Sequence, residues 1–97
     1  MNPDQIQAAV AAHPAWTHAN ERGGLMRRTF TFPDFKAAFA FMSQMAEFSE
    51  SIQHHPEWFN VYHRVEVTLT THDAGGLSEK DFQWARQADA LYQTSGS

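Results

Sequence analysis

The longest segment with a single hydrophobic period, Phe35 to Gln53, constrains the fold of this chain most. Its apolar side chains recur at helical intervals, and His54-His55-Pro56 ends it because a proline disfavours helix in the residue before it. At about 100° per residue the apolar side chains cover an arc of roughly 200°, whereas packing against one core needs a stripe of only about 100°. We therefore predict a long helix with one face on a sheet, and we expect Phe41 and Phe48 to contact a partner chain.

Residues 58–71 follow a different period, because apolar and polar side chains alternate along the run. This period of two predicts β-structure. At about 3.3 Å per residue the run is longer than a strand that a small domain pairs, so we place a break near Tyr62-His63-Arg64, although no Gly or Pro marks it. The apolar positions, which we expect to share one face, are Phe59, Val61, Val65, Val67 and Leu69.

The segments before the long helix predict a short helix and a β-hairpin. Asn2-Pro3-Asp4 supplies a cap, a first-turn proline and a first-turn acid, and Pro14 ends this helix after about three turns. In Glu21-Arg22-Gly23-Gly24 the two glycines supply the positive φ angles that a tight reversal needs. Arg28 falls on the apolar face of the second arm, where it has to pair with a carboxylate or extend outward, and we expect a solvated edge position.

A final helix is predicted from a cap at Ser78, with Asp81 at the third helical position. It is predicted to end near Tyr92, and residues 93–97 form a polar tail that we expect to fray. The order of elements is thus α-β-β-α-β-β-α, which is typical of an α+β fold: a four-stranded antiparallel sheet with three helices packed on one face. Residues 1–97 form a single domain.

The length of the chain bears on its assembly. At 97 residues it buries only about 60 to 65% of the surface that its unfolded form exposes. Its core is therefore thin, and a wide apolar arc on the long helix favours packing against another subunit. We expect a homodimer or a homotetramer formed through the long helix, without a basis for choosing between them.

Composition excludes several classes of protein. A formal net charge of -4, from 7 basic and 11 acidic side chains, gives no electrostatic footprint for direct nucleic-acid binding. The absence of cysteine excludes disulfides, cysteine-bearing zinc sites and thiol nucleophiles, and it fits a reducing cytoplasm. No export signal is evident, and no run approaches the roughly 18 apolar residues that span a bilayer, so we expect a cytoplasmic protein without membrane contact.

The candidate catalytic residues in this sequence are histidines. His54 and His55 lie at a junction between helix and strand, and His72 leaves the second strand run into a loop, so the three imidazoles are able to converge across the sheet. For His13, His18 and His63 we expect capping or solvated positions. Adjacent histidines point in divergent directions and no HExxH spacing is present, so we predict no metal site. Neither a GxSxG motif nor a phosphate-binding glycine loop is present.

The spacing of these residues resembles a known family. Glu50, His54, His55, Pro56, Tyr62, His72 and Asp81 match the signature of the pterin-4a-carbinolamine dehydratases, also known as the dimerization cofactor of a homeodomain transcription factor. The similarity extends to Trp16, to Phe30, Phe32 and Phe35, to residues 57–62, and to Gly76-Leu77. It covers nearly the whole chain from Trp16 onward. One departure is His63, where a small amide is expected, but that position lies outside the signature.

The resemblance implies an enzyme, 4a-hydroxytetrahydrobiopterin dehydratase, that converts 4a-hydroxytetrahydrobiopterin to quinonoid dihydropterin plus water. The step belongs to tetrahydrobiopterin recycling and implies a functional link to an aromatic amino acid hydroxylase. Loss of water from a carbinolamine needs a proton delivered to the hydroxyl and one removed from a ring nitrogen, so paired imidazoles suffice and no cofactor is expected. The alternative is a protein-binding or regulatory dimerization module. The physiological pterin side chain stays open.

The resemblance also implies roles for particular residues. His54, His55 and His72 are the expected catalytic residues, with His54 or His55 as the acid and His72 as the base. Asp73 and Glu50 are candidate acceptors for the polar edge of the pterin, and Asp81 is first a helix cap. Trp58 and Tyr62 are candidates for a wall of the site, with simple strand packing as the alternative. The expected substrate contacts are His54, His55, Pro56, Thr71, His72, Asp73, Ala74 and Glu50.

Overall fold

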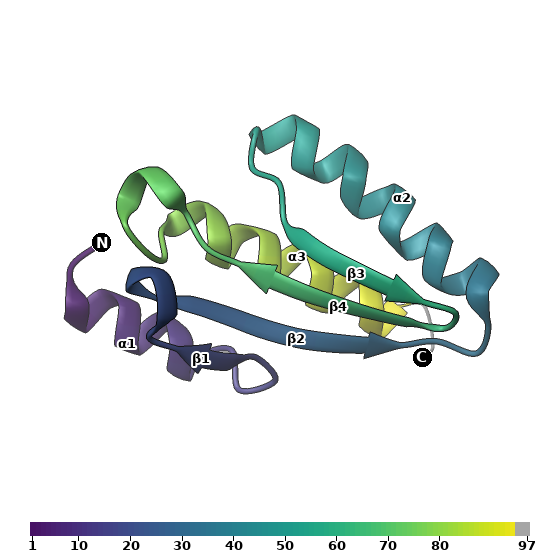
Figure 1. Cartoon of the computed structure of the whole chain (residues 1–97), viewed down its shortest axis with the longest axis horizontal. Helices are drawn as coiled ribbons and strands as arrows, with labels where there is room; N and C mark the ends of the chain where they lie inside the picture. Colours follow the sequence, from purple (N-terminus) through teal and green to yellow (C-terminus); the bar gives the residue numbers. More distant parts are fainter. Residues whose placement is uncertain (95–97) are drawn as a thin grey trace.

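The computed structural model describes residues 1–94 and has the predicted order of elements (Figure 1). The helices are α1 (Pro3–Ala11), α2 (Phe35–Ile52) and α3 (Glu79–Thr94). The strands are β1 (Thr17–Ala19), β2 (Leu25–Thr31), β3 (Glu57–Val61) and β4 (Arg64–Leu69), and two short 3-10 helices, η1 (Glu21–Gly23) and η2 (His72–Ala74), lie in loops. Of the predicted polar tail, residues 93 and 94 belong to α3 and residues 95–97 lie outside the described residues.

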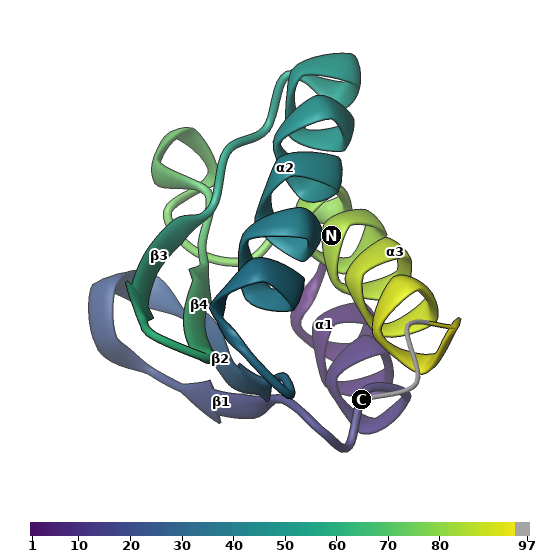
Figure 2. The ribbon, with the colours of Figure 1, turned by 90° about the vertical axis from the view of Figure 1, so that its right-hand side faces the viewer.

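The strands form one antiparallel sheet in the order β1-β2-β4-β3. All three helices lie against one face of this sheet, and the other face is left open (Figure 2). This arrangement confirms the predicted α+β fold. Within residues 1–94, no helix is both long and apolar enough to span a bilayer.

Helix α2 packs on the sheet through a different part of its apolar arc than we predicted. Its buried residues are Ala38, Phe41, Met45 and Ser49, spaced three or four apart as one helical face requires. Phe41 is only 3% exposed, and its ring lies 4.8 Å from the ring of Phe30 in the core. The prediction that Phe41 contacts a partner chain is therefore wrong, and Phe48 is also packed against the core.

The apolar side chains that α2 leaves exposed lie at the edge of the arc. Phe35 is 47% and Phe39 is 55% exposed, with their rings 5.8 Å apart. Hydrophobic periodicity predicted the width of the apolar arc on α2, but it did not predict which part of that arc packs on the sheet. The buried face carries small side chains, Ala38 and Ser49, beside large ones, and the buried Ser49 hydroxyl accepts a hydrogen bond from Trp84 Nε1 at 2.8 Å.

The predicted break in residues 58–71 is confirmed. Tyr62 adopts a positive φ of 50°, and Val61 pairs with Arg64 across the turn. A two-residue turn reverses the phase of the alternation, so the inward neighbours of the buried Val65 and Val67 are residues 60 and 58. Phe59 and Val61 consequently lie on the open face, 61% and 42% exposed, and the prediction that they share the core face of β4 is wrong.

Arg28 does not occupy the solvated edge position that we expected. It donates to Oδ1 of Asp89 at 2.7 Å, its side chain is 19% exposed, and its guanidinium lies 4.6 Å from the ring centroid of Phe30. Trp16 Nε1 donates to the same carboxylate at 3.0 Å. His13, for which we expected a capping or solvated position, lies 3.7 Å from Asp89 and stacks on Phe82. The Asp89 cluster thus joins the sheet, α3 and the segment after α1.

Candidate active site

The end of helix α2 presents His54 to one end of the sheet. Gln53 takes the left-handed conformation, with φ 53°, which ends the helix in the way that a C-terminal glycine usually does. The backbone N–H of His54 still donates to Ser49 O at 3.0 Å, so the start of the connection is tied to the last helical turn. From there the chain passes through Pro56 directly into β3.

The loop after β4 presents His72 and Asp73. Thr71 and Gly76 form an isolated bridge, with Thr71 N–H donating to Gly76 O at 2.8 Å and Gly76 N–H donating to Thr71 O at 3.2 Å. This bridge closes a compact loop around η2. The two side chains are therefore carried on a short hydrogen-bonded loop and not on a long free one.

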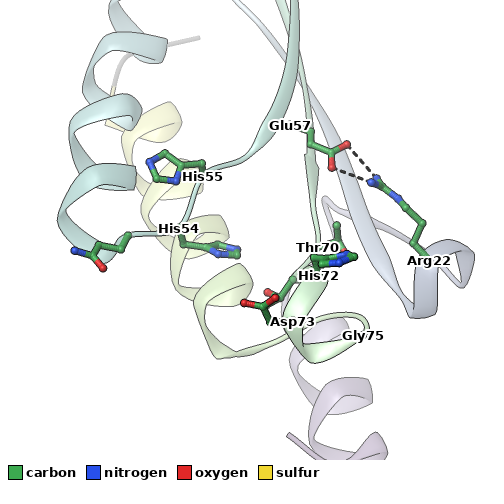
Figure 3. Close-up of a pocket in the computed structure, with 10 residues that line it drawn as sticks. Arg22, His54, His55, Glu57, Thr70, His72, Asp73 and Gly75 are labelled. Carbon is green, nitrogen blue, oxygen red and sulfur yellow. Dashed lines mark hydrogen bonds and ion pairs between the residues drawn. The ribbon is translucent and has the colours of Figure 1, made fainter.

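His54 and His72 line the same cavity, although they lie in separate parts of the sequence. The cavity has a volume of about 720 Å³, within the range of small-molecule sites. The ring of His54 points across it toward His72 and Asp73 (Figure 3). The lining residues are Arg22, Gln53, His54, His55, Glu57, Thr70, Thr71, His72, Asp73 and Gly75.

Asp81 holds His54 from behind the cavity. Its side chain is completely buried, and Oδ1 lies 2.6 Å from Nε2 of His54. The other oxygen, Oδ2, accepts from the Thr71 hydroxyl at 2.7 Å and from the Ser78 backbone N–H at 2.9 Å. Because Asp81 lies in the first turn of α3, the helix N-terminus also favours its negative charge. Asp81, predicted at the third position of this helix start, thus also anchors an imidazole, whereas the hydroxyl of Ser78, the predicted cap, bonds to the Thr71 hydroxyl at 2.6 Å.

His55 is arranged differently from His54. Its ring points back toward α2, away from the ring of His54 (Figure 3), and its Nε2 lies 2.5 Å from Oε2 of Glu50. Both side chains of this pair are exposed, 62% for His55 and 77% for Glu50. His55 therefore stands at the rim of the cavity, with Glu50 outside the lining.

Among the described residues, the imidazole of His72 has no hydrogen-bond partner. The ring is exposed at the cavity, so neither of its nitrogens is committed to a protein group. The described residues hold no group of His, Cys, Asp or Glu side chains with the geometry of a metal site.

Sequence reasoning missed the pair formed by Arg22 and Glu57. Arg22 donates from Nη1 to Oε2 of Glu57 at 2.8 Å and from Nη2 to Oε1 at 3.1 Å. These hydrogen bonds lower the pKa of Glu57 below its usual value, and hydrogen bonding to Glu57 with the charge of its carboxylate raises the pKa of Arg22. The only sequence signal was a charged residue in each of two segments that the fold brings to the cavity.

Several residues expected at the site lie outside the cavity lining. Pro56 and Ala74 flank lining residues without being among them. Tyr62 lies at the far turn of the β3–β4 hairpin, 62% exposed, and Trp58 packs on Trp84 with 6.1 Å between ring centroids. Strand packing, the alternative that we gave for Trp58, is confirmed.

Comparison with known proteins places the chain in a family. Residues 1–91 match the family described as pterin 4 alpha carbinolamine dehydratase. A protein of Rhizorhabdus wittichii, provisionally named pterin-4-alpha-carbinolamine dehydratase, is 52% identical over 91 residues, which cover 94% of this chain and 93% of that protein. The crystal structure of a transcriptional coactivator/pterin dehydratase from Brucella melitensis superposes with a TM-score of 0.87 at 40% identity, covering 95% of this chain and 97% of that one.

A more distant structure shares the fold. A pterin dehydratase-like protein identified as a RuBisCO assembly factor in the alpha-carboxysome has a TM-score of 0.69 at 23% identity, covering 80% of this chain and 89% of that one. The family match over residues 1–91 and the identity to the two nearer relatives decide the assignment. This chain belongs to the pterin-4a-carbinolamine dehydratase family.

Proposed function

We propose that this protein is a 4a-hydroxytetrahydrobiopterin dehydratase that serves tetrahydrobiopterin recycling. The reaction breaks the bond between C4a and the hydroxyl oxygen, removes a proton from a ring nitrogen, and forms a carbon–nitrogen double bond and water. It needs a proton donor and a proton acceptor on either side of one heterocycle. The observation that carries the proposal is that His54 and His72 line one cavity, with His54 held by a buried carboxylate.

His54 is the proposed acid. An ionised carboxylate only accepts hydrogen bonds, so Asp81 fixes a proton on Nε2 of His54 and leaves Nδ1 as the nitrogen that exchanges a proton with the substrate. The proton passes to the departing hydroxyl, and the negative charge of Asp81 stabilises the imidazolium before the transfer, as the carboxylate of a catalytic triad does.

His72 is the proposed base, because its nitrogens are not committed to the protein and the ring of His54 points toward it across the cavity (Figure 3). It accepts the proton from the ring nitrogen of the substrate. Asp73 and the backbone around Thr71 are proposed to bind the amino-pyrimidine edge, since a carboxylate accepts from its N–H groups. His55, supported by Glu50 at the rim, is proposed to contribute less than the other two histidines.

Single and double replacement of His54 and His72 by alanine tests this proposal. Each replacement is expected to lower the enzymatic acceleration of dehydration about 10²- to 10⁴-fold, the usual contribution of a positioned acid or base. Stopped-flow absorbance on freshly generated 4a-hydroxytetrahydrobiopterin measures the rate, and circular dichroism checks the fold. His63→Ala, in the exposed β3–β4 turn, is the matched control and is expected to keep full activity. Wild-type turnover in a folded double variant would refute the proposal.

A second proposed role is assembly through α2, as a homodimer or homotetramer that also serves as a protein-binding module. The exposed rings of Phe35 and Phe39 favour it, because aromatic side chains gathered on one helix are uncommon on the surface of a monomer. The relative from Brucella melitensis is described as a transcriptional coactivator, which supports a regulatory role. Light scattering on wild-type protein and on Phe35→Ser/Phe39→Ser is the test. A wild-type mass of one chain at all concentrations would exclude this role.

A further inference from the structure

The Arg22–Glu57 pair forms a part of the cavity that the proposed proton transfers do not use. It lies on the far side of the cavity from His54, with His72 and Thr70 between them (Figure 3). The two residues come from the two edge strands of the sheet, since Arg22 follows β1 and Glu57 opens β3. Two hydrogen bonds of 2.8 and 3.1 Å join them in the fork geometry that fixes the guanidinium in one plane.

Backbone conformation and close packing fix the turn that carries Arg22. Arg22 adopts a left-handed conformation, with φ 55°, which costs a side-chain-bearing residue free energy relative to glycine. The following Gly23 lies so close to the loop of His72 that a Cβ there would be 1.8 Å from Gly75 O. The Thr70 hydroxyl also donates to Gly24 O at 2.8 Å. The turn that carries Arg22 and the loop that carries His72 are therefore packed as one unit.

The chemistry of the pair suits a hydroxylated ligand. Arg22 uses two of its N–H donors on Glu57, and its other donors have no hydrogen-bond partner among residues 1–94. The Glu57 carboxylate has lone pairs beyond the two that accept from Arg22. Both side chains are about half exposed to the cavity and solvent. A hydroxyl group both donates and accepts, so neighbouring hydroxyls can bond to the carboxylate and the guanidinium together. A methyl group can do neither.

The charge around the cavity disfavours an anionic ligand group at this place. Among the described lining residues, Arg22 carries the only permanent positive charge, and it is paired with Glu57. Asp73 also lines the cavity, and Asp81 lies buried behind His54. A phosphate here would have to displace Glu57 from Arg22 and would face the remaining carboxylate charge.

We infer that Arg22 and Glu57 form the subsite for the C6 substituent of the pterin, and that they select a neutral, hydroxylated side chain over an alkyl or a phosphorylated one. The inference rests on the proposed function. With the reacting carbon between His54 and His72 and the amino-pyrimidine edge at Asp73, the Arg22–Glu57 side of the cavity remains for the substituent on the other ring.

Steady-state kinetics with three substrates tests the inference. The 4a-hydroxytetrahydropterins carry a dihydroxypropyl, a methyl or a phosphorylated side chain at C6. Arg22→Asn removes the guanidinium and retains a residue that tolerates the left-handed conformation. It is expected to raise KM for the dihydroxypropyl substrate roughly three- to tenfold, the effect of losing one or two exposed hydrogen bonds, and to change KM for the methyl substrate less than twofold. Glu57→Gln is expected to relieve the rejection of the phosphorylated substrate.

Arg27→Ala is the matched control, because Arg27 lies 3.6 Å from Glu21 in an exposed pair outside the cavity lining. It is expected to leave KM for all three substrates unchanged. Equal changes in KM for the dihydroxypropyl and methyl substrates in Arg22→Asn, or no change for either, would overturn the inference.

Binding separates failure of this inference from failure of the proposed function. Calorimetry with the stable 7,8-dihydropterins that carry the same three side chains measures preference without turnover. A wild-type preference for the dihydroxypropyl compound that is lost in Arg22→Asn supports the subsite even if no dehydration is detected. Equal affinity of the wild type for all three compounds rejects the subsite even if dehydration is fast.

Discussion

Two carboxylates on helix α3, Asp81 and Asp89, lie about two turns apart and have different partners. Asp89 is partly exposed, and its nearest partner is Arg28, a cation that keeps its charge at any pH at which proteins fold. Asp81 is completely buried, and it binds a hydroxyl, a backbone N–H and His54. The imidazole of His54 is the type of group that general acid–base catalysis uses.

The difference between their partners indicates that the two carboxylates of α3 serve different purposes. The Asp89 cluster, with Arg28, Trp16 and the nearby His13, joins elements of the fold through a direct pair of carboxylate and guanidinium. The Asp81 group positions His54, the proposed acid of the dehydration. A carboxylate paired with a guanidinium is suited to hold elements together, and a buried carboxylate paired with an imidazole is suited to support proton transfer.

The largest effect is expected from Asp81→Asn. The amide keeps the size of the side chain, but it removes the charge and can donate to Nε2 of His54, which reverses the tautomer. We expect kcat for dehydration to fall about 10²- to 10⁴-fold while KM changes little. Stopped-flow kinetics with a thermal melt measures both function and fold. A kcat within threefold of the wild type would remove the distinction between the two carboxylates.

An intermediate effect, on stability and not on turnover, is expected from Asp89→Asn. It leaves the largely buried guanidinium of Arg28 without its carboxylate, at a cost of about 1 to 3 kcal/mol in the free energy of unfolding. Urea denaturation measures this cost, and kcat at 25 °C is expected to stay within twofold of the wild type. Adding Arg28→Met removes the unpaired charge and is expected to restore part of the stability. A loss of kcat without a loss of stability would contradict this account.

The smallest effect concerns a third acid, the exposed Glu57. Hydrogen bonding from Arg22 lowers the pKa of Glu57 below its ordinary value of 4.5 in the folded state. The pair therefore adds stability above the pKa of Glu57 in the unfolded chain, and this stability is lost as the pH falls through the folded value. We expect a small difference in Tm between wild type and Glu57→Gln at pH 7 that shrinks toward low pH. High salt is expected to shrink it as well, and a difference that grows on acidification would reverse the assigned sign.

The sequence was sufficient to predict the order of elements and the meeting of His54 with His72. Helix caps, a proline and two clear hydrophobic periods define the ends of the elements, and those ends carry both histidines. Because β3 runs antiparallel to β4, the connection from α2 into β3 and the end of β4 lie at the same end of the sheet. Local patterns were enough for this part because the site is built from the ends of regular elements.

Contacts between distant surfaces were not predictable in the same way. The exposed side of α2 and the open-face position of Phe59 depend on packing and on the phase of a turn. The partnership of Arg28 with Asp89 and that of Arg22 with Glu57 join residues that no local pattern relates. A single sequence shows that a charge is present, but its partner follows only from the register of the sheet and the placement of α3.

The Asp81 side chain lies in the first turn of α3 and also orients His54, so the formation of that helix and the positioning of this imidazole are coupled. A molecule in which α3 has not formed also has no anchored His54, because the carboxylate, Thr71 and Ser78 come together only when that helix starts. On the proposed mechanism, molecules in which α3 has not formed would lose most of their dehydratase activity together with that helix. The specific dehydratase activity of a sample would then report the fraction of molecules in which α3 is formed.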